Sequence, residues 1–265
     1  MSKKHVIIIG SSSGIGKSLA KTLKQKTNYK VICGSHMIGD KFMFVDLTKR
    51  ESIFKFISNL KKVLKDEKID LLVLNSGIAS SSALIRTNDY DLDKSFEINT
   101  INQVVLLREI ADLLKSNSKV LFINSKSALI TLPFLGIYAA TKKANLAIAD
   151  ALRFELSRLK VKVVSVFIGN TKTKMWTDKF IIADEIIERN DGYKEQMETA
   201  LRLGKRKYGS GMAPEYVADK LVNIINQNKP RNNYYLGKDA WTFVFFKNFL
   251  PRSLTHYIIK KQYGL

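Results

Sequence analysis

Short apolar runs alternate along the chain with longer amphipathic stretches. The runs have the length of buried strands, and the stretches between them place apolar residues at helical spacing. We therefore predict seven strands, over 5–9, 30–34, 41–45, 69–74, 119–123, 161–168 and 233–236. Helices are predicted over 15–26, 50–65, 94–115, 137–159 and 214–227.

This alternation predicts one α/β domain over residues 1–265. Strands with continuous apolarity are buried on both faces, and right-handed crossovers place the connecting helices on both sides of the sheet. The expected fold class is therefore a doubly wound, mainly parallel, seven-stranded sheet of the Rossmann-like type. The chain length suits one such domain with a core of its own.

Two segments depart from the alternation. Residues 170–212 are polar and contain two short helical patterns, so we expect them to leave the sheet and form a substrate lid. Residues 241–265 are rich in aromatic and basic residues and contain no acid. Two interpretations of this apolar and basic C-terminal tail stay open. Either its aromatic residues pack on the domain or a partner subunit, or they insert shallowly into an anionic membrane surface.

Composition and charge narrow the function classes. The chain carries 44 Lys and Arg against 24 Asp and Glu, a net charge of +20. The basic residues are scattered, and no nucleic-acid-binding motif accompanies them, so we expect a solvated basic surface and no nucleic-acid partner. One cysteine, Cys33, and three widely separated histidines argue against a disulfide framework and a zinc site. No metal is therefore expected.

The same features favour a reducing cytoplasm as the location. No apolar stretch reaches the roughly 18 to 20 residues that span a bilayer, so neither a signal peptide nor a spanning helix is expected. Whether the protein also contacts a membrane peripherally through the tail stays open.

A glycine-rich turn links the first predicted strand to the first predicted helix, with Gly10, Gly14 and Gly16 in a G-x3-G-x-G spacing. Backbone N–H groups and the positive end of a helix dipole at such a turn bind a pyrophosphate. Glycine is needed where a side chain would block that approach or where φ is positive. The spacing differs from the common G-x-G-x-x-G fingerprint, and a purely structural turn is the alternative.

A second group of residues indicates proton chemistry. Tyr138 and Lys142 lie four apart at the start of a predicted helix and therefore share one face. Ser125 stands thirteen residues before Tyr138, at the end of the fifth predicted strand, where open parallel sheets place their sites. A nearby ammonium favours phenolate, so we predict that Lys142 lowers the pKa of Tyr138 toward neutrality. An ordinary pair on a helix surface is the alternative.

With these residues in place, the chain resembles the short-chain dehydrogenase/reductase family over nearly its whole length. Residues 10–16 resemble the family's T-G-x3-G-x-G turn, with Ile9 where threonine is usual. Asp46-Leu47 resembles its adenine-contacting pair, and residues 75–77 resemble its Asn-Asn-Ala-Gly motif with two substitutions. Thr173 ends a segment similar to its Pro-Gly-x-hydrophobic-x-Thr motif.

The resemblance implies an NAD(P)-dependent oxidoreductase that interconverts a carbonyl and an alcohol by hydride transfer. It implies that Tyr138 is the general acid/base and that Ser125 holds the carbonyl oxygen. It also implies that Lys142 binds the nicotinamide ribose, and that the backbone carbonyl of Asn99 holds a proton-relay water. The residues implied to contact the dinucleotide are Gly10, Ser12, Ser13, Gly14, Ile15, Gly16, Ser35, His36, Asp46, Leu47, Asn75, Gly77, Tyr138, Lys142 and Thr173.

The second predicted strand favours NADP over NAD. NAD-binding chains generally place an acid at the end of that strand, where it holds the ribose hydroxyls. Here the strand is followed by Ser35 and His36, so no acid opposes a 2′-phosphate at these positions. We therefore predict NADPH as the preferred cofactor.

The substrate is predicted to be a hydrophobic, lipid-like carbonyl compound or alcohol. Apolar residues stand between Ser125 and Tyr138 and at the start of the lid segment, namely Leu129, Ile130, Leu132, Pro133, Phe134, Trp176 and Phe180. The tail is similar to those of family members that act on lipids. Three alternatives stay open. The apolar residues pack in the core, the substrate is a 3-oxoacyl thioester of an acyl carrier protein or coenzyme A, or the chain binds a dinucleotide without catalysing a reaction. A second copy of the chain, in a homodimer, is the expected protein partner.

Overall fold

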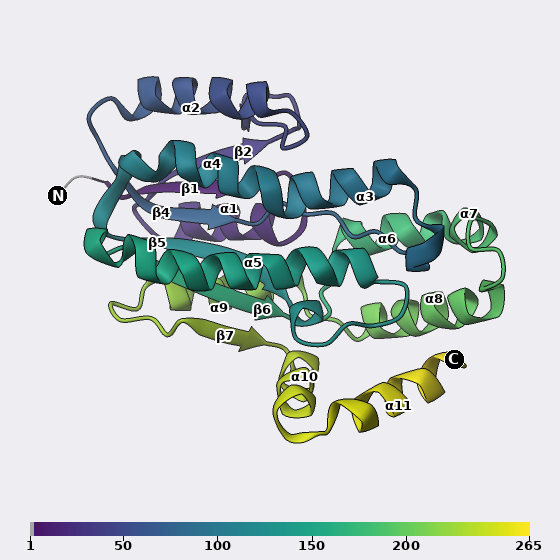
Figure 1. The fold of residues 1–265 in the computed structure, drawn as a ribbon. Coiled ribbons are helices and arrows are strands. Elements are labelled where there is room, and N and C mark those ends of the chain that lie inside the picture. The colour runs from purple at the N-terminus through teal and green to yellow at the C-terminus, as the bar shows by residue number, and fades with distance from the viewer. Residues whose placement is uncertain (1–2) are drawn as a thin grey trace.

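Seven parallel strands form one sheet in the computed structural model, which describes residues 3–265 (Figure 1). The strands are β1 (His5–Ile9), β2 (Lys30–Ser35), β3 (Met43–Phe44), β4 (Ile69–Leu74), β5 (Leu114–Ser125), β6 (Lys162–Ile168) and β7 (Asn233–Leu236). Their order is β3-β2-β1-β4-β5-β6-β7, and each neighbouring pair is parallel. The predicted doubly wound α/β fold is confirmed, and the sheet is fully rather than mainly parallel.

Helices cover both faces of this sheet. They are α1 (Gly14–Lys26), α2 (Arg50–Leu64), α3 (Asp89–Phe96), α4 (Asn102–Ile110), α5 (Gly136–Glu155), α6 (Lys174–Ile181), α7 (Ala183–Glu188), α8 (Lys194–Gly209), α9 (Pro214–Ile225), α10 (Lys238–Phe249) and α11 (Arg252–Tyr263). Side chains of one strand alternate between the faces, because successive Cβ atoms point to opposite sides. Val6 and Ile8 pack with α1 and α9, whereas Ile7 and Ile9 pack with α2, α4 and α5.

The strand order places a crevice above the centre of the sheet. The chain builds β1, β2 and β3 outward in one direction and then returns to place β4 on the other side of β1. The loops after β1 and β4 therefore leave in opposite directions at the carboxyl edge of the sheet. Such a switch point is where open α/β sheets bind ligands.

The helix predicted over 94–115 differs from the observed structure. It begins earlier, at Asp89, and a π-helical turn over Glu97–Ile101 separates α3 from α4. It also ends earlier, because β5 begins at Leu114 and not at the predicted residue 119. The apolar pattern continues through the π-turn, so periodicity alone does not reveal it.

The segments outside the sheet are more helical than predicted. Residues 170–212 contain three helices, α6, α7 and α8, where the sequence indicated two helical patterns. The tail forms α10 and α11, which extend from the end of β7 along one side of the molecule (Figure 1). Among the helices of residues 3–265, none has the length and apolarity needed to cross a bilayer.

Candidate active site

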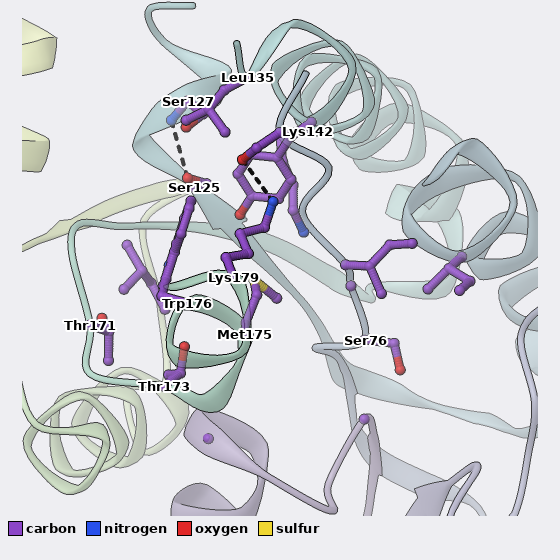
Figure 2. Close-up of a pocket in the computed structure, with 18 of the residues that line it drawn as sticks. Ser76, Ser125, Ser127, Leu135, Lys142, Thr171, Thr173, Met175, Trp176 and Lys179 are labelled. Atoms are coloured by element: carbon purple, nitrogen blue, oxygen red, sulfur yellow. Dashed lines mark hydrogen bonds between the residues drawn. The ribbon is translucent and has the colours of Figure 1, made fainter. Parts of the chain in front are cut away.

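A pocket of about 760 Å³ opens at the carboxyl edge of the sheet. The glycine turn after β1 and the segments that follow β2, β3, β4, β5 and β6 line it. Residues of α3, α5, α6 and α8 and the end of α11 also contribute to its wall. Figure 2 shows part of this wall, with Ser125, Lys142, Trp176 and Lys179 drawn around it. Its volume lies within the usual range of about 300 to 1,000 Å³ for ligand pockets.

Two glycines of the turn permit close backbone packing. Gly10 has φ +86°, and a Cβ there would lie 2.6 Å from the backbone nitrogen of Ser76. A Cβ on Gly16 would lie 2.2 Å from the Gly10 carbonyl oxygen, which also accepts a 2.7 Å hydrogen bond from Asn75 Nδ2. Gly16 therefore packs α1 against the turn and is not part of the pocket wall, unlike the other predicted glycines Gly10, Gly14 and Gly77.

The start of α1 fits a phosphate group. Ser12, Ser13, Gly14 and Ile15 line the pocket, and the Ser13 side chain makes no capping hydrogen bond to α1. Unpaired N–H groups and the helix dipole at such a terminus favour an anion. A Cβ on Gly14 would lie 3.2 Å from Thr173 Cγ2, so the missing side chain keeps the space between these residues open. The residues present therefore fit a dinucleotide pyrophosphate.

The far end of the pocket contains the predicted adenine and ribose contacts. Ser35 is buried, and its Oγ accepts a 3.0 Å hydrogen bond from the Met37 N–H, whereas His36 is exposed. Asp46 Oδ1 accepts hydrogen bonds from the N–H and Oγ1 of Thr48, at 2.9 and 2.7 Å. Burial raises the pKa of Asp46, but the Thr48 hydrogen bonds and the nearby Lys49 and His36 together outweigh it, so the net pKa is lowered. Asp46 thus stabilises its own turn while it lines the pocket beside Leu47.

Ser125, Tyr138 and Lys142 are brought together in the middle of the pocket. Ser125 ends β5, and its Oγ accepts a 3.2 Å hydrogen bond from the Ser127 N–H (Figure 2). Tyr138 and Lys142 lie in the first turns of α5, and their side chains line the pocket together with Ser125. Lys142 Nζ lies 5.9 Å from the centroid of the Tyr138 ring and donates a 3.3 Å hydrogen bond to the Ile123 carbonyl.

The predicted lowering of the Tyr138 pKa is wrong. Burial raises the pKa of Tyr138, and the nearby Ser125 side chain only partly opposes this rise. Burial also lowers the pKa of Lys142 to about 8. Both shifts have one cause, since a dry environment disfavours the charged form of either group. Tyr138 is therefore neutral near pH 7 and carries a proton that it can donate.

Asn99 lies behind this group and not in the pocket wall. It is fully buried in the π-turn, where its Oδ1 accepts a hydrogen bond from the Ile78 N–H and its Nδ2 donates one to the Ile78 carbonyl, both at 2.8 Å. Its backbone carbonyl accepts a 2.7 Å hydrogen bond from Asn145 Nδ2. The sequence analysis missed Asn145, although it stands seven residues after Tyr138 and so shares its helix face.

The substrate side of the pocket is largely apolar. Among the predicted residues, Leu132, Pro133, Phe134, Trp176 and Phe180 line it. Leu129 and Ile130 do not, because they pack with Phe167 in a separate cluster. The Trp176 ring meets the Tyr138 ring edge to face at 6.5 Å.

Further wall residues were missed by the sequence analysis. Met197, Leu201 and Lys207 come from α8, Lys179 from α6 and Tyr263 from the end of α11. Burial raises the pKa of Tyr263 to about 12. Lys179 stands between the predicted Trp176 and Phe180 along the chain, whereas the packing of α8 and α11 brings the other four residues to the pocket.

A doubly wound sheet with a glycine turn before α1 and buried tyrosine and lysine side chains at its carboxyl edge is typical of oxidoreductases that bind a dinucleotide. The model of the short chain dehydrogenase family matches residues 4–181, more than half of the chain. The chain therefore belongs to this family and is an oxidoreductase acting on carbonyl and alcohol groups.

Several curated relatives cover nearly the whole chain. The 3-amino-tetrahydro-pyrrolizinone reductase of Xenorhabdus hominickii is 27% identical over 258 residues, 92% of this chain and 90% of its own. The NADPH-dependent 1-acyldihydroxyacetone phosphate reductase of Saccharomyces cerevisiae is 25% identical over 276 residues, 99% of this chain and 92% of its own.

Solved structures show the same fold. A short-chain dehydrogenase from Streptomyces avermitilis superposes with a TM-score of 0.78 at 19% identity, covering 100% of this chain and 98% of that one. A short chain dehydrogenase from Burkholderia cenocepacia, solved in complex with NADP, has a TM-score of 0.76 at 20% identity and covers 97% and 98%.

Proposed function

We propose that this protein is an NADPH-dependent reductase of a hydrophobic, lipid-like carbonyl compound, able to oxidise the matching alcohol in reverse. The observation that carries the proposal is the Tyr138 hydroxyl, which lies beside the Ser125 side chain and an apolar wall that includes Trp176. A relative in Bacteroides thetaiotaomicron, 22% identical over 100% of both chains, is named 3-ketodihydrosphingosine reductase and supports a lipid-like substrate.

In this proposal the chain's residues handle the proton and the carbonyl oxygen. The dinucleotide supplies the hydride when it is bound. Tyr138 donates its proton to the carbonyl oxygen, and Ser125 donates a hydrogen bond to the same oxygen and so stabilises the charge that develops there. Lys142 holds the ribose and returns a proton to Tyr138. The backbone carbonyl of Asn99, which is fixed by Asn145, would hold the water of the proton relay.

The preference for NADPH rests on the residues after β2. A 2′-phosphate there would meet the Ser35 hydroxyl and the exposed His36 rather than an acid. The Asp46 carboxylate, also in the pocket wall, already accepts two hydrogen bonds from Thr48. The NADPH-dependent yeast relative and the NADP complex of a protein with this fold agree with this preference.

Residues 170–212 serve as the substrate lid in this proposal. Trp176 and Phe180 of α6 and Leu201 of α8 line the pocket and face the catalytic group across it. They supply the apolar surface that a long-chain substrate would bury.

We also propose that the tail docks on an anionic membrane surface. Trp241, Phe249 and Tyr257 are 57, 72 and 63% exposed. Exposed basic residues accompany them, namely Lys247, Arg252, Lys260 and Lys261. An aromatic surface edged by lysines suits shallow insertion beside acidic headgroups. Tyr263, by contrast, is buried against Met197 and anchors α11 to the pocket wall.

Cofactor oxidation tests the enzyme proposal. Purified protein is assayed with NADPH and a panel of long-chain ketones and aldehydes, with a 3-oxoacyl thioester as the competing class. Tyr138→Phe should lower kcat about 10² to 10⁴-fold while NADPH still binds. If the variant keeps more than about a hundredth of the activity, Tyr138 is not the proton donor.

Vesicle pelleting tests the docking proposal. The full chain should sediment with anionic vesicles, and the variant Trp241→Ser/Phe249→Ser should not. A solution mass of two chains that falls to one in the same variant, without vesicle binding, would assign this surface to the predicted homodimer instead.

A further inference from the structure

Lys179 is a buried cation on the substrate side of the pocket. It lies on α6 with 8% of its surface exposed, and its Nζ donates a 2.7 Å hydrogen bond to Ser81 Oγ. Nζ also lies 5.8 Å from the centroid of the Trp176 ring. Figure 2 shows the Lys179 side chain extending from α6 into the pocket among the drawn residues.

No carboxylate neutralises this lysine among residues 3–265. The ion pairs there involve other basic residues, and the acids Asp93 and Glu97 in the same pocket wall form none with Lys179. Burial lowers the pKa of Lys179 to about 7, and the opposing attraction of Asp91 does not offset it. A buried ammonium whose only partner is a hydroxyl costs stability. Such an arrangement in a pocket points to a ligand that supplies the missing charge.

Lys126, another lysine of the pocket wall, shows the contrasting arrangement. Its Nζ pairs with the Asp239 carboxylate at 2.5 Å and donates to Asn170 Oδ1 at 2.8 Å. Lys126 is thus satisfied by the fold and has a structural role, joining the loop after β6 to α10. Lys179 retains donor capacity, because an ammonium has three N–H groups and the protein uses one.

The position of Lys179 relates it to the reacting carbonyl. The Trp176 ring, 5.8 Å from Nζ, is itself 6.5 Å from the Tyr138 ring. The two distances together set the outer limit of the separation between the ammonium and the Tyr138 ring centroid. One extended substrate molecule can therefore place a carbonyl at Tyr138 and a charged group at Lys179 within the same pocket.

We propose that Lys179, with the Ser81 hydroxyl, binds an anionic group of the substrate, so that this enzyme selects amphiphiles that carry an apolar chain and a phosphate or carboxylate in addition to the carbonyl. The inference rests on the proposed function, since it assigns the substrate of the same pocket. The chain of such a substrate would lie along Phe180, Met197 and Leu201. An anion beside Nζ also favours its protonated form, so binding would restore the charge of the lysine.

Direct binding of non-reacting probes tests the proposal without requiring turnover. The full chain, saturated with NADPH, is titrated calorimetrically with decyl phosphate, decanoate and the neutral probe 1-decanol. The wild type should bind at least one of the two anions about tenfold or more tightly than decanol, as expected for a charge-assisted hydrogen bond in a dry pocket. The stronger of the two anions identifies the group that the site prefers.

Lys179→Met should lose this preference while Lys174→Met keeps it. Lys174 lies on the same helix but is exposed and outside the pocket, so it controls for the general loss of one positive charge. Circular dichroism and NADPH binding establish that each variant folds, and Lys179→Gln serves if the methionine variant does not.

Three results would overturn the proposal. They are a wild type without anion preference, a preference that Lys179→Met retains, and a Lys179→Met variant that loses NADPH affinity instead. The last would assign the lysine to a cofactor phosphate. Tyr138→Phe should still bind the anionic probe more tightly than decanol. Failure of the proposed reductase activity can therefore be distinguished from failure of the proposed anion site.

Discussion

The side-chain amide of Asn145 donates a 2.7 Å hydrogen bond to the backbone carbonyl of Asn99. The π-turn over Glu97–Ile101 directs that carbonyl at α5, and Asn145 is three residues beyond Lys142 on the same helix. The contact therefore holds the π-turn against the helix that carries Tyr138 and Lys142. Asn145 acts as a positioning residue, because it touches the relay carbonyl and lies outside the pocket wall.

Asn145→Ala should destabilise the fold by about 1 to 3 kcal/mol, because the buried Asn99 carbonyl would lose its donor. Asn145→Leu, which keeps the volume but not the donor, should cost a similar amount. Urea denaturation measures both. A leucine variant as stable as the wild type would mean that Asn145 only fills space.

Gly16→Ala should destabilise the protein by about 1 to 3 kcal/mol or more and weaken dinucleotide binding. The new Cβ would lie 2.2 Å from the Gly10 carbonyl oxygen and 2.5 Å from Asn75 Nδ2, so the turn must move. Gly209→Ala is the matched control, because a Cβ at that helical glycine meets nothing within 4 Å. We expect this control to be neutral or slightly stabilising. Equal effects of the two substitutions on NADPH affinity would contradict the packing argument.

His36→Asp should reverse part of the preference for NADPH. A carboxylate at this exposed pocket position would repel a 2′-phosphate and accept hydrogen bonds from the ribose hydroxyls of NADH. We expect the ratio of NADH to NADPH dissociation constants to fall about tenfold or more, a change of about 1.4 kcal/mol. His36→Asn has nearly the same shape without the charge and should change the ratio far less. Fluorescence titration of both cofactors measures it, and equal shifts in the two variants would exclude the charge as the cause.

Lys179→Met should stabilise the protein most at low pH. Burial lowers the pKa of Lys179 in the folded chain to about 7, against 10.5 for the ordinary side chain. Between these values the unfolded chain binds a proton that the folded chain lacks, so the wild type gains stability as the pH rises. The advantage of the variant should therefore be a few kcal/mol below pH 7 and shrink toward pH 10.

Urea denaturation at pH 6, 8 and 9.5 measures this difference. The pKa of Lys142 is lowered in the same way, but this lysine is present in both proteins and so largely cancels in the comparison. Lys174→Met, at an exposed position, should show no such trend. A pH-independent gain for Lys179→Met would mean that packing, and not charge burial, causes it.

The strands of the sheet were predictable because burial on both faces requires continuous apolar runs. The run over 69–74, for example, coincides with β4 (Ile69–Leu74). The π-turn at Asn99 was not predictable, because the residues around it keep an ordinary helical pattern while the backbone gains one residue in a single turn. The helices of the tail were missed for a different reason, since the exposed Phe245 and Phe249 interrupt any one-sided apolar stripe.

The sequence by itself determined the sheet, the glycine turn and the spacing of Tyr138 and Lys142, because these depend on residue types that lie close together along the chain. Only the tertiary structure decided which buried lysines have a carboxylate partner. Lys126 and Lys179 look alike in a lysine-rich chain, yet one is paired with Asp239 and the other is buried beside Ser81. The tertiary structure also decided the direction in which the pKa of Tyr138 shifts, because the free energy of an ionised group depends on how much water its folded surroundings exclude.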